Sequence, residues 1–183
     1  MGESEFPGPG LYFCHQVAAI ELRVDHYPAI VKSLHWADED ATAAFAQRLA
    51  SQPGLGDAFI ALHGDLGAGK TTLVRHLLQA MGVQGRVKSP TYAVVESYQV
   101  AGQHILHFDF YRFNDPQEWE DAGFRELFAS RGVKLAEWPE KVADRLPPAD
   151  LDIHLQAQAD NQRSVTLTSR TATGRALVQG AAP

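Results

Sequence analysis

The chain has 183 residues, of which 45% are apolar and 21% are charged, and its formal net charge at neutral pH is −6. This length and composition are typical of one globular domain with a sizeable core, and two full domains are not expected. The acidic balance argues against a protein whose main activity is to bind bare DNA or RNA, because such proteins usually carry a basic excess. Any connection with nucleic acid is therefore expected to be indirect.

The cysteine content and the apolar runs indicate the compartment. Cys14 is the single cysteine, so an internal disulfide cannot form and no thiolate metal site is expected. No run approaches the roughly 18 apolar residues that a membrane span needs. The N-terminus also lacks the positively charged start of a secretion signal. These features predict a cytoplasmic protein that makes no contact with a membrane.

The ends of the chain differ from its middle. The first ten residues are rich in turn formers, and we treat residues 1–30 as an N-terminal extension that can be disordered. Residues 31–170 carry the periodic segments and are predicted to form the domain. Residues 171–183 are mostly small and are predicted to be a flexible tail.

Four elements are predicted in the first half of the chain from apolar periodicity and helix boundary signals. Asp38 is a suitable N-cap for an alanine-rich helix that Pro53 and Gly54 end. Gly82 stands in the usual position after a helix that ends at Met81. In chain order the elements are an edge strand at residues 31–36, a helix at 39–51, a buried strand at 58–62 and a helix at 70–81.

Strands dominate the second half of the chain. Gly102 and Gln103 separate two β-prone segments that are predicted to form a hairpin. Asp115 and Pro116 are favoured at the start of a helix, which is predicted to reach about residue 130 with a break near Gly123. The predicted strands are residues 92–98, 104–110, 133–137, 151–157 and 163–169, and the last two are expected to form an antiparallel pair.

Residues 64–71 match the pattern G-x-x-x-x-G-K-[ST] of a phosphate-binding loop and stand between a predicted strand and a predicted helix. A chance match to this pattern has odds of roughly one in a couple of hundred for such a chain. Glycines let the backbone amides face phosphate oxygens, and the helix start adds its positive end. Lys70, expected to be exposed, would reach the β- and γ-phosphates, and Thr71 would offer its hydroxyl to magnesium. The predicted nucleotide-binding residues are Asp65, Leu66, Gly67, Ala68, Gly69, Lys70, Thr71 and Thr72.

Cleavage of a γ-phosphoryl bond also needs a carboxylate near the metal and a group that orients water. Asp109 and Glu137 each end a predicted strand, and ligands collect at the carboxyl ends of parallel strands. From spacing alone, each residue could equally be a solvated strand end. His107 and Asp109 share a strand face and could hold a transition metal, but the remaining ligands of such a site cannot be named.

A polar segment at residues 89–91 follows the helix of the phosphate loop. Ser89 and Thr91 carry hydroxyls that could contact magnesium or the γ-phosphate and become ordered only with triphosphate bound, as in nucleotide switches. The alternative is that Ser89, Pro90 and Thr91 form only a turn before a strand.

Four motifs together resemble the TsaE (YjeE) family of small bacterial ATPases: G-D-L-G-A-G-K-T-T at 64–72, S-P-T-Y at 89–92, H-F-D-F-Y-R at 107–112 and E-W-P at 137–139. The likeness covers about residues 31–170. The first motif is common, whereas the other three together are highly specific to the family. Phe110 stands where leucine is frequent, an apolar exchange without chemical consequence.

The resemblance implies a P-loop NTPase-like α/β fold, a three-layer sandwich with a mixed, mainly parallel central sheet and the C-terminal antiparallel strand pair. It implies ATP and Mg²⁺ as ligands. It also implies a partnership with the TsaD and TsaB proteins, which make threonylcarbamoyladenosine in tRNA. In that family the ATPase does not carry out the transfer, and hydrolysis resets the complex between turnovers.

The same resemblance assigns roles to single residues. Lys70 matches the phosphate-contacting lysine, Thr71 the magnesium hydroxyl and Asp109 a magnesium-associated carboxylate. Glu137 matches the acidic residue of the Glu-Trp motif and is expected to orient the attacking water, and it is also a candidate metal ligand. Residues 89–91 match the switch segment. Hydrolysis by the chain alone is expected to be slow, because the sequence shows no obvious arginine finger dedicated to the γ-phosphate. Arg112 is the nearest candidate.

Two other functions use the same loop. A small-molecule kinase needs an acceptor pocket and an arginine-rich lid, but the arginines after residue 130 are scattered along the sequence. A GTP-driven switch would carry an N-K-x-D tetrapeptide to read guanine, and the sequence contains none. An ATPase is therefore the leading hypothesis, with the kinase as the alternative.

Overall fold

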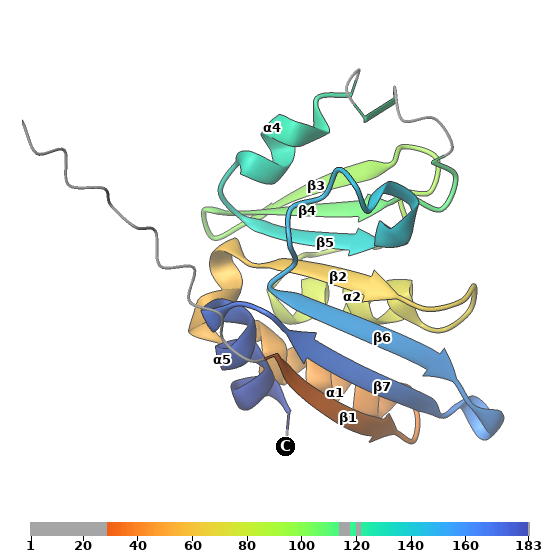
Figure 1. Ribbon diagram of the computed structural model, residues 1–183. Helices are drawn as coiled ribbons and strands as arrows, with labels where there is room; N and C mark the ends of the chain where they lie inside the picture. Colours follow the sequence, from red (N-terminus) through yellow and green to blue (C-terminus); the bar gives the residue numbers. More distant parts are fainter. Residues whose placement is uncertain (1–28, 114–117, 120–121, 183) are drawn as a thin grey trace, which may run out of the picture.

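The structure is a computed structural model that describes residues 29–113, 118–119 and 122–182. Almost all of the predicted N-terminal extension, including Cys14, lies outside the described residues, as does the predicted helix start at Asp115 and Pro116. The described residues form one seven-stranded sheet with helices packed against it (Figure 1). Among them, no helix is both long enough and apolar enough to cross a membrane.

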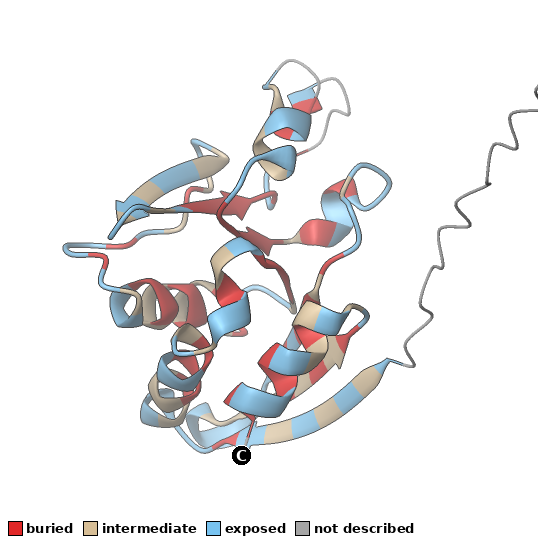
Figure 2. Cartoon of the chain, turned by 90° about the vertical axis from the view of Figure 1, so that its left-hand side faces the viewer, coloured by how far each residue is buried: buried red, intermediate tan, exposed pale blue. Residues whose placement is uncertain are grey.

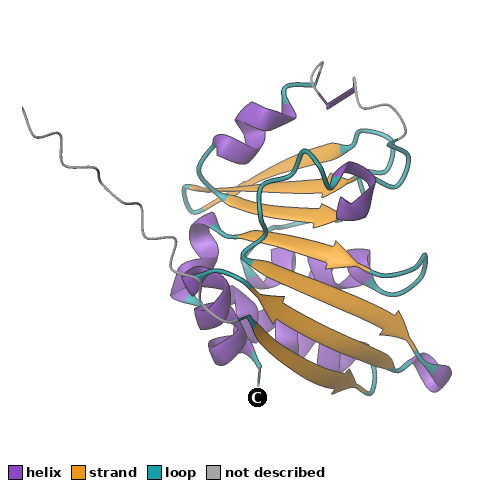
Figure 3. Ribbon diagram, in the orientation of Figure 1, coloured by secondary structure: helices purple, strands orange, loops and turns teal. Residues whose placement is uncertain are grey.

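The strands follow the order β1-β7-β6-β2-β5-β4-β3 across the sheet (Figure 1). Figure 3 shows the strands and helices in the same orientation. The predicted edge strand, the hairpin formed by β3 and β4 and the antiparallel pair formed by β6 and β7 are all present. The strands are β1 (Ile30–Trp36), β2 (Phe59–His63), β3 (Val95–Val100), β4 (Gln103–Asp109), β5 (Val133–Glu137), β6 (Leu151–Ala157) and β7 (Arg163–Ser169).

Helices lie on both faces of the sheet. The predicted N-cap of the first helix is confirmed, since the Asp38 side chain accepts a hydrogen bond from the Ala41 amide at 2.8 Å. The α-helices are α1 (Glu39–Ala50), α2 (Lys70–Ala80), α4 (Phe124–Ala129) and α5 (Ala172–Ala181). Short 3₁₀ helices span η1 (Pro53–Asp57), η2 (Pro139–Val142) and η3 (Ala159–Asn161).

The sheet is less parallel than predicted. The neighbours β6-β2, β2-β5 and β5-β4 are parallel, but the pairs β1-β7, β7-β6 and β4-β3 are antiparallel. The hairpin and the C-terminal pair each place an antiparallel strand beside the parallel centre, and β1 adds a third antiparallel pairing at the edge. The sheet is therefore evenly mixed, with a parallel centre of four strands.

Each face of the sheet has its own core, because successive residues of a strand point to opposite faces. Ile60 and Leu62 pack under α1, α2 and α5, whereas Phe59 and Ala61 belong to an aromatic cluster under α4 and η2. Figure 2 shows buried residues in the central strands and in the helices that pack against them. On β1 the alternate positions face solvent, as Val31 shows with 63% of its surface exposed.

The predicted flexible tail is wrong, because residues 172–181 form α5. Thr171 caps the helix by accepting a hydrogen bond from the Gly174 amide at 3.0 Å, and Leu177 and Val178 are buried in the main core. A Cβ atom on Gly174 would lie 1.7 Å from the carbonyl oxygen of Asp150. The small residues that suggested a frayed end therefore allow the helix to lie close to the sheet.

The other boundary corrections are small. The segment predicted as a strand from residue 92 is a turn up to Ala93, and β3 begins at Val95. Val94 between them has a positive φ of 64°, which is not extended backbone. In the predicted helix that reaches residue 130, α4 begins directly after Gly123, where the break was expected.

Candidate functional site

The 64–71 loop joins β2 to α2, in the strand–loop–helix context that the sequence predicted. Gly64, Gly67 and Gly69 have φ angles of 131°, 81° and 107°, which side chains rarely adopt. A Cβ atom on Gly64 would lie 2.2 Å from the carbonyl oxygen of Leu155 in β6, so the loop starts in direct contact with the neighbouring strand. Glycine is therefore required at Gly64 by both conformation and space.

Lys70, the first residue of α2, is only 4% exposed, so the expectation of an exposed lysine was wrong. Its Nζ donates to the carbonyl oxygens of Gly64 and of Asp65, the latter at 3.0 Å, and lies 3.8 Å from the ring centroid of Trp138. Burial lowers the pKa of Lys70, and nearby carboxylates, of which Glu137 acts most strongly, oppose that shift. The ammonium group is thus held inside the loop.

Thr71 and Glu137 are in direct contact. The Thr71 hydroxyl lies 2.9 Å from both carboxylate oxygens of Glu137, and the Glu137 side chain is almost fully buried. Glu137 ends β5 in register with Asp109 at the end of β4. Because β2, β5 and β4 are parallel, the loop and both carboxylates lie at the same edge of the sheet.

Asp109 has different partners. One of its carboxylate oxygens accepts hydrogen bonds from the hydroxyls of Ser89 and Thr91, the latter at 2.7 Å. The other accepts from the Tyr111 amide at 2.9 Å. Asp109 therefore ties the predicted switch segment to the end of β4.

Oxygen donors that suit magnesium occur where the loop meets β5. A threonine hydroxyl and a carboxylate are hard oxygen ligands, and Mg²⁺ commonly takes one or two such protein ligands beside phosphate oxygens. Thr71 and Glu137 fit this pattern. The alternative transition-metal site at His107 and Asp109 has no support, since no cluster of three or more histidine, cysteine or acidic side chains suited to a metal occurs within the described ranges.

A hollow of about 370 Å³ lies beside the loop and was missed by the sequence analysis. It is lined by Asp38 and Thr42 from the start of α1, by Gly69, and by Leu155 and Arg163 from β6 and β7. Arg163 also donates from Nε to the carbonyl oxygen of Ala68 at 2.8 Å. The residues come from three separate parts of the sequence, so no local motif marks the hollow.

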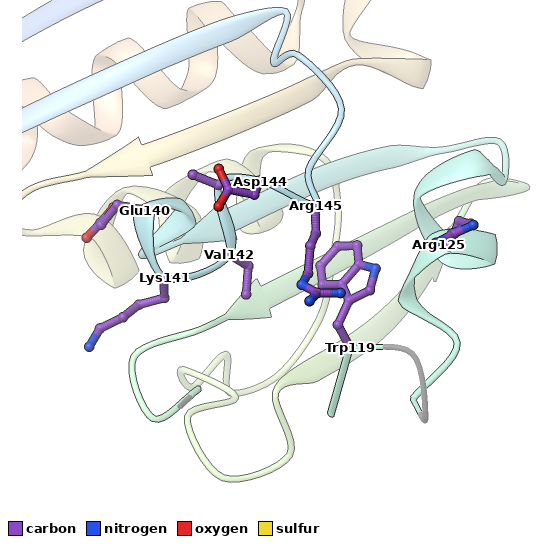
Figure 4. Close-up of a pocket in the computed structure, with 8 residues that line it drawn as sticks. Trp119, Arg125, Glu140, Lys141, Val142, Asp144 and Arg145 are labelled. Carbon is purple, nitrogen blue, oxygen red and sulfur yellow. The ribbon is translucent and has the colours of Figure 1, made fainter. Parts of the chain in front are cut away.

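Another hollow, of about 720 Å³, lies elsewhere, between α4 and η2. Figure 4 shows that Arg145 reaches toward Trp119, whereas Lys141 and Arg125 point away from each other at opposite ends. Its cationic side chains do not converge on one point, so we assign it no ligand.

His63, the residue before Gly64, belongs to an ionic cluster. Its Nε2 lies 2.9 Å from Asp152 Oδ1, and its Nδ1 lies 3.6 Å from Glu140 Oε2. Burial by itself lowers the pKa of His63, but hydrogen bonds with Asp152 and Glu140 outweigh it and raise the pKa to about 9. The charged imidazole thus links β2 to β6 and to η2.

Comparison with known proteins identifies the family. The family model described as "Threonylcarbamoyl adenosine biosynthesis protein TsaE" matches residues 36–165, which is more than half of the chain. The chain belongs to the TsaE family. The resemblance predicted from the four motifs is confirmed, and the family has its role in the biosynthesis of tRNA threonylcarbamoyladenosine.

Several TsaE proteins are similar in sequence. The chain is 47% identical over 117 residues to the tRNA threonylcarbamoyladenosine biosynthesis protein TsaE of Haemophilus influenzae, covering 64% of this chain and 73% of that protein. It is 35% identical over 141 residues to the protein of the same name from Bacillus subtilis, covering 76% of this chain and 87% of that protein. The crystal structure of Bacillus subtilis YdiB is similar with a TM-score of 0.64 and 26% identity, covering 83% of this chain and 95% of that one.

Proposed function

We propose that this protein binds and hydrolyses ATP with Mg²⁺ to support the TsaB–TsaD complex that makes threonylcarbamoyladenosine in tRNA. The observation that carries the proposal is the 64–71 loop, whose Thr71 hydroxyl contacts the Glu137 carboxylate at the end of a parallel strand. That arrangement supplies backbone amides, a lysine and oxygen ligands at one place, which is the set a nucleoside triphosphate with magnesium requires.

The two halves of the nucleotide have different binding sites in this proposal. The phosphates bind to the amides of the 64–71 loop and to the positive end of α2, an 11-residue helix. The nucleoside binds in the adjoining hollow of about 370 Å³, where Leu155 offers an apolar wall and Asp38 and Arg163 offer polar groups. Lys70 leaves the loop carbonyls and the Trp138 ring to contact the phosphates.

The contacts favour a division of roles between the carboxylates that differs from the one the motifs implied. Glu137 with Thr71 is positioned to hold Mg²⁺, which when bound neutralises charge on the phosphate oxygens. Asp109 holds the hydroxyls of Ser89 and Thr91 and so controls the predicted switch segment. We therefore assign Glu137 to the metal and Asp109 to the switch.

The proposed need for partners is supported by the position of Arg112. Its side chain donates a hydrogen bond to the Tyr92 hydroxyl at 3.2 Å, and its guanidinium carbon lies 4.5 Å from the centre of the Tyr92 ring. Arg112 therefore contacts an exposed tyrosine at the surface of the protein. A charge supplied in trans can accelerate phosphoryl transfer by roughly a thousandfold or more. We therefore expect slow hydrolysis by the chain alone and stimulation by TsaB with TsaD.

The test measures phosphate release from ATP by the isolated chain and by its mixture with TsaB and TsaD. Stimulation in the mixture, lost in the Lys70→Ala variant, supports the proposal. No release in either sample, or release that the partners do not change, contradicts it. The kinase alternative predicts turnover only with an added acceptor, so phosphate release into water separates the two. Competition between ATP and GTP for binding tests the preference for adenine.

A further inference from the structure

His107 is a buried polar residue with one contact that bears on the site. It lies on β4, two residues before Asp109, and its side chain is fully buried. Its Nε2 lies 2.9 Å from Glu137 Oε1, on the neighbouring strand β5. The imidazole therefore approaches the same carboxylate that Thr71 contacts, but from within the sheet rather than from the loop.

The chemistry of the pair fixes the direction of this hydrogen bond. An ionised carboxylate only accepts hydrogen bonds, so Nε2 of His107 is the donor in this contact. Nδ1 has no protein partner among the described residues. The same face of β4 and β5 carries Ile105, Val133 and Leu135, which are fully buried and apolar. Burying a polar imidazole among apolar side chains costs folding free energy, and the hydrogen bond with Glu137 offsets part of that cost.

We propose that His107 is a positioning residue that orients Glu137 for the metal. This inference rests on the proposed function. His107 and the shared Thr71 hydroxyl both contact Oε1, whereas among the described residues Oε2 is contacted by the Thr71 hydroxyl only. The contact from His107 restrains the carboxylate from within the sheet and leaves Oε2 with the Thr71 hydroxyl, at the start of α2, as its contact. Groups that hold a metal ligand in this way commonly contribute ten- to a hundredfold to metal affinity.

The test compares two substitutions of similar size. His107→Leu removes the donor, whereas His107→Gln keeps an amide N–H close to the position of Nε2. Calorimetry measures ATP affinity in excess Mg²⁺ and in EDTA. We expect His107→Leu to lower the affinity in Mg²⁺ by about tenfold and to leave the affinity in EDTA within about twofold, since the effect passes through the metal ligand. His107→Gln should recover most of the loss.

Two controls separate positioning from general damage to the core. Val133→Ala opens a cavity in the neighbouring strand without touching Glu137, so it should lower the melting temperature but not the ratio of the two affinities. In a Glu137→Ala background, His107→Leu should cause no further loss of Mg²⁺ dependence, because the contact it removes is already absent.

The outcomes are distinct. If wild type and His107→Leu show the same Mg²⁺ dependence of ATP affinity, this inference is overturned but the proposed function is not. The same holds if His107→Leu and His107→Gln lose the same affinity in Mg²⁺. Absence of any ATP binding by the wild type overturns the proposed function and this inference with it. Should His107→Leu not fold, His107→Asn replaces it, because its shorter amide cannot reach Glu137. A loss of ATP affinity in Mg²⁺ for His107→Asn but not for His107→Gln then supports the inference. Equal affinities of these two variants overturn it.

Discussion

Gly64→Ala probes the contact between the 64–71 loop and β6. The substitution places a Cβ atom 2.2 Å from the Leu155 carbonyl oxygen and 3.1 Å from the Ala68 Cβ, at a φ of 131°. Gly67→Ala is the matched control, because Gly67 also has a positive φ, 81°, but a Cβ atom there would meet nothing within 4 Å. The two variants add the same methyl group to the same loop and differ in the space around it.

The expected costs follow from these two environments. Gly67→Ala should lower the free energy of unfolding by about 1–2 kcal/mol, the cost of a left-handed conformation for a residue with a side chain. Gly64→Ala should add backbone strain of about 1–3 kcal/mol and a steric cost of about 1–3 kcal/mol. The total is about 2–6 kcal/mol, because the Leu155 carbonyl oxygen at 2.2 Å belongs to the backbone and cannot rotate away.

The assay is urea unfolding of the full chain, followed by tryptophan fluorescence, with ATP affinity measured on the same samples. We expect Gly64→Ala to be the less stable variant and to lose ATP binding even below its unfolding transition, since the loop must move away from Leu155. Equal losses of stability in the two variants would refute the reasoning, because they would mean that the loop does not lie against β6.

Three further predictions concern charged groups of the site. Lys70→Ala should lower ATP affinity by at least about tenfold, since a hydrogen bond to a charged group contributes about 1.5–3 kcal/mol, and a calorimetric affinity equal to that of the wild type contradicts it. Glu137→Gln should raise the Mg²⁺ concentration needed for ATP binding, whereas Asp109→Asn should spare that dependence and alter protease cleavage near residues 89–91; the reverse pattern would exchange their roles. The pKa of His63 is raised to about 9 in the folded protein, so its charged pairs stabilise the fold fully below about pH 6.5 and lose this effect as the pH rises through 9. The free energy of unfolding should fall by about 1–2 kcal/mol over this pH range, less than the full pKa shift implies, because water screens the half-exposed Glu140. His63→Gln should make the urea midpoint of unfolding depend less on pH.

The parts of the site that could be predicted from sequence are those that local rules determine. The glycine pattern and the flanking apolar runs located the 64–71 loop between β2 and α2. Asp109 and Glu137 could be placed at one edge because each ends an apolar run and parallel strands align their carboxyl ends. The even mixture of parallel and antiparallel pairs was missed, because the pairing of β1 with β7 joins segments far apart in sequence.

The contacts made by long side chains could not be predicted. Spacing gives no signal that Arg163 reaches the Ala68 carbonyl oxygen, 95 positions away, or that His63 pairs with Asp152. The burial of Lys70 was also hidden, because it depends on the Trp138 ring, which a left-handed backbone with a φ of 58° directs back over the loop. Each of these contacts depends on the completed sheet rather than on a local pattern.

These distant contacts bear on how the loop would select its ligand. Arg163 fixes the Ala68 carbonyl oxygen and also lines the adjoining hollow, while Leu155 both limits Gly64 and forms a wall of the same hollow. The side chains that shape the loop are therefore those that a nucleoside in the hollow would touch. If the nucleoside binds there as proposed, its contacts with Arg163 and Leu155 act on the conformation of the phosphate-binding amides. Recognition of the base and binding of the phosphates are then coupled through the same residues.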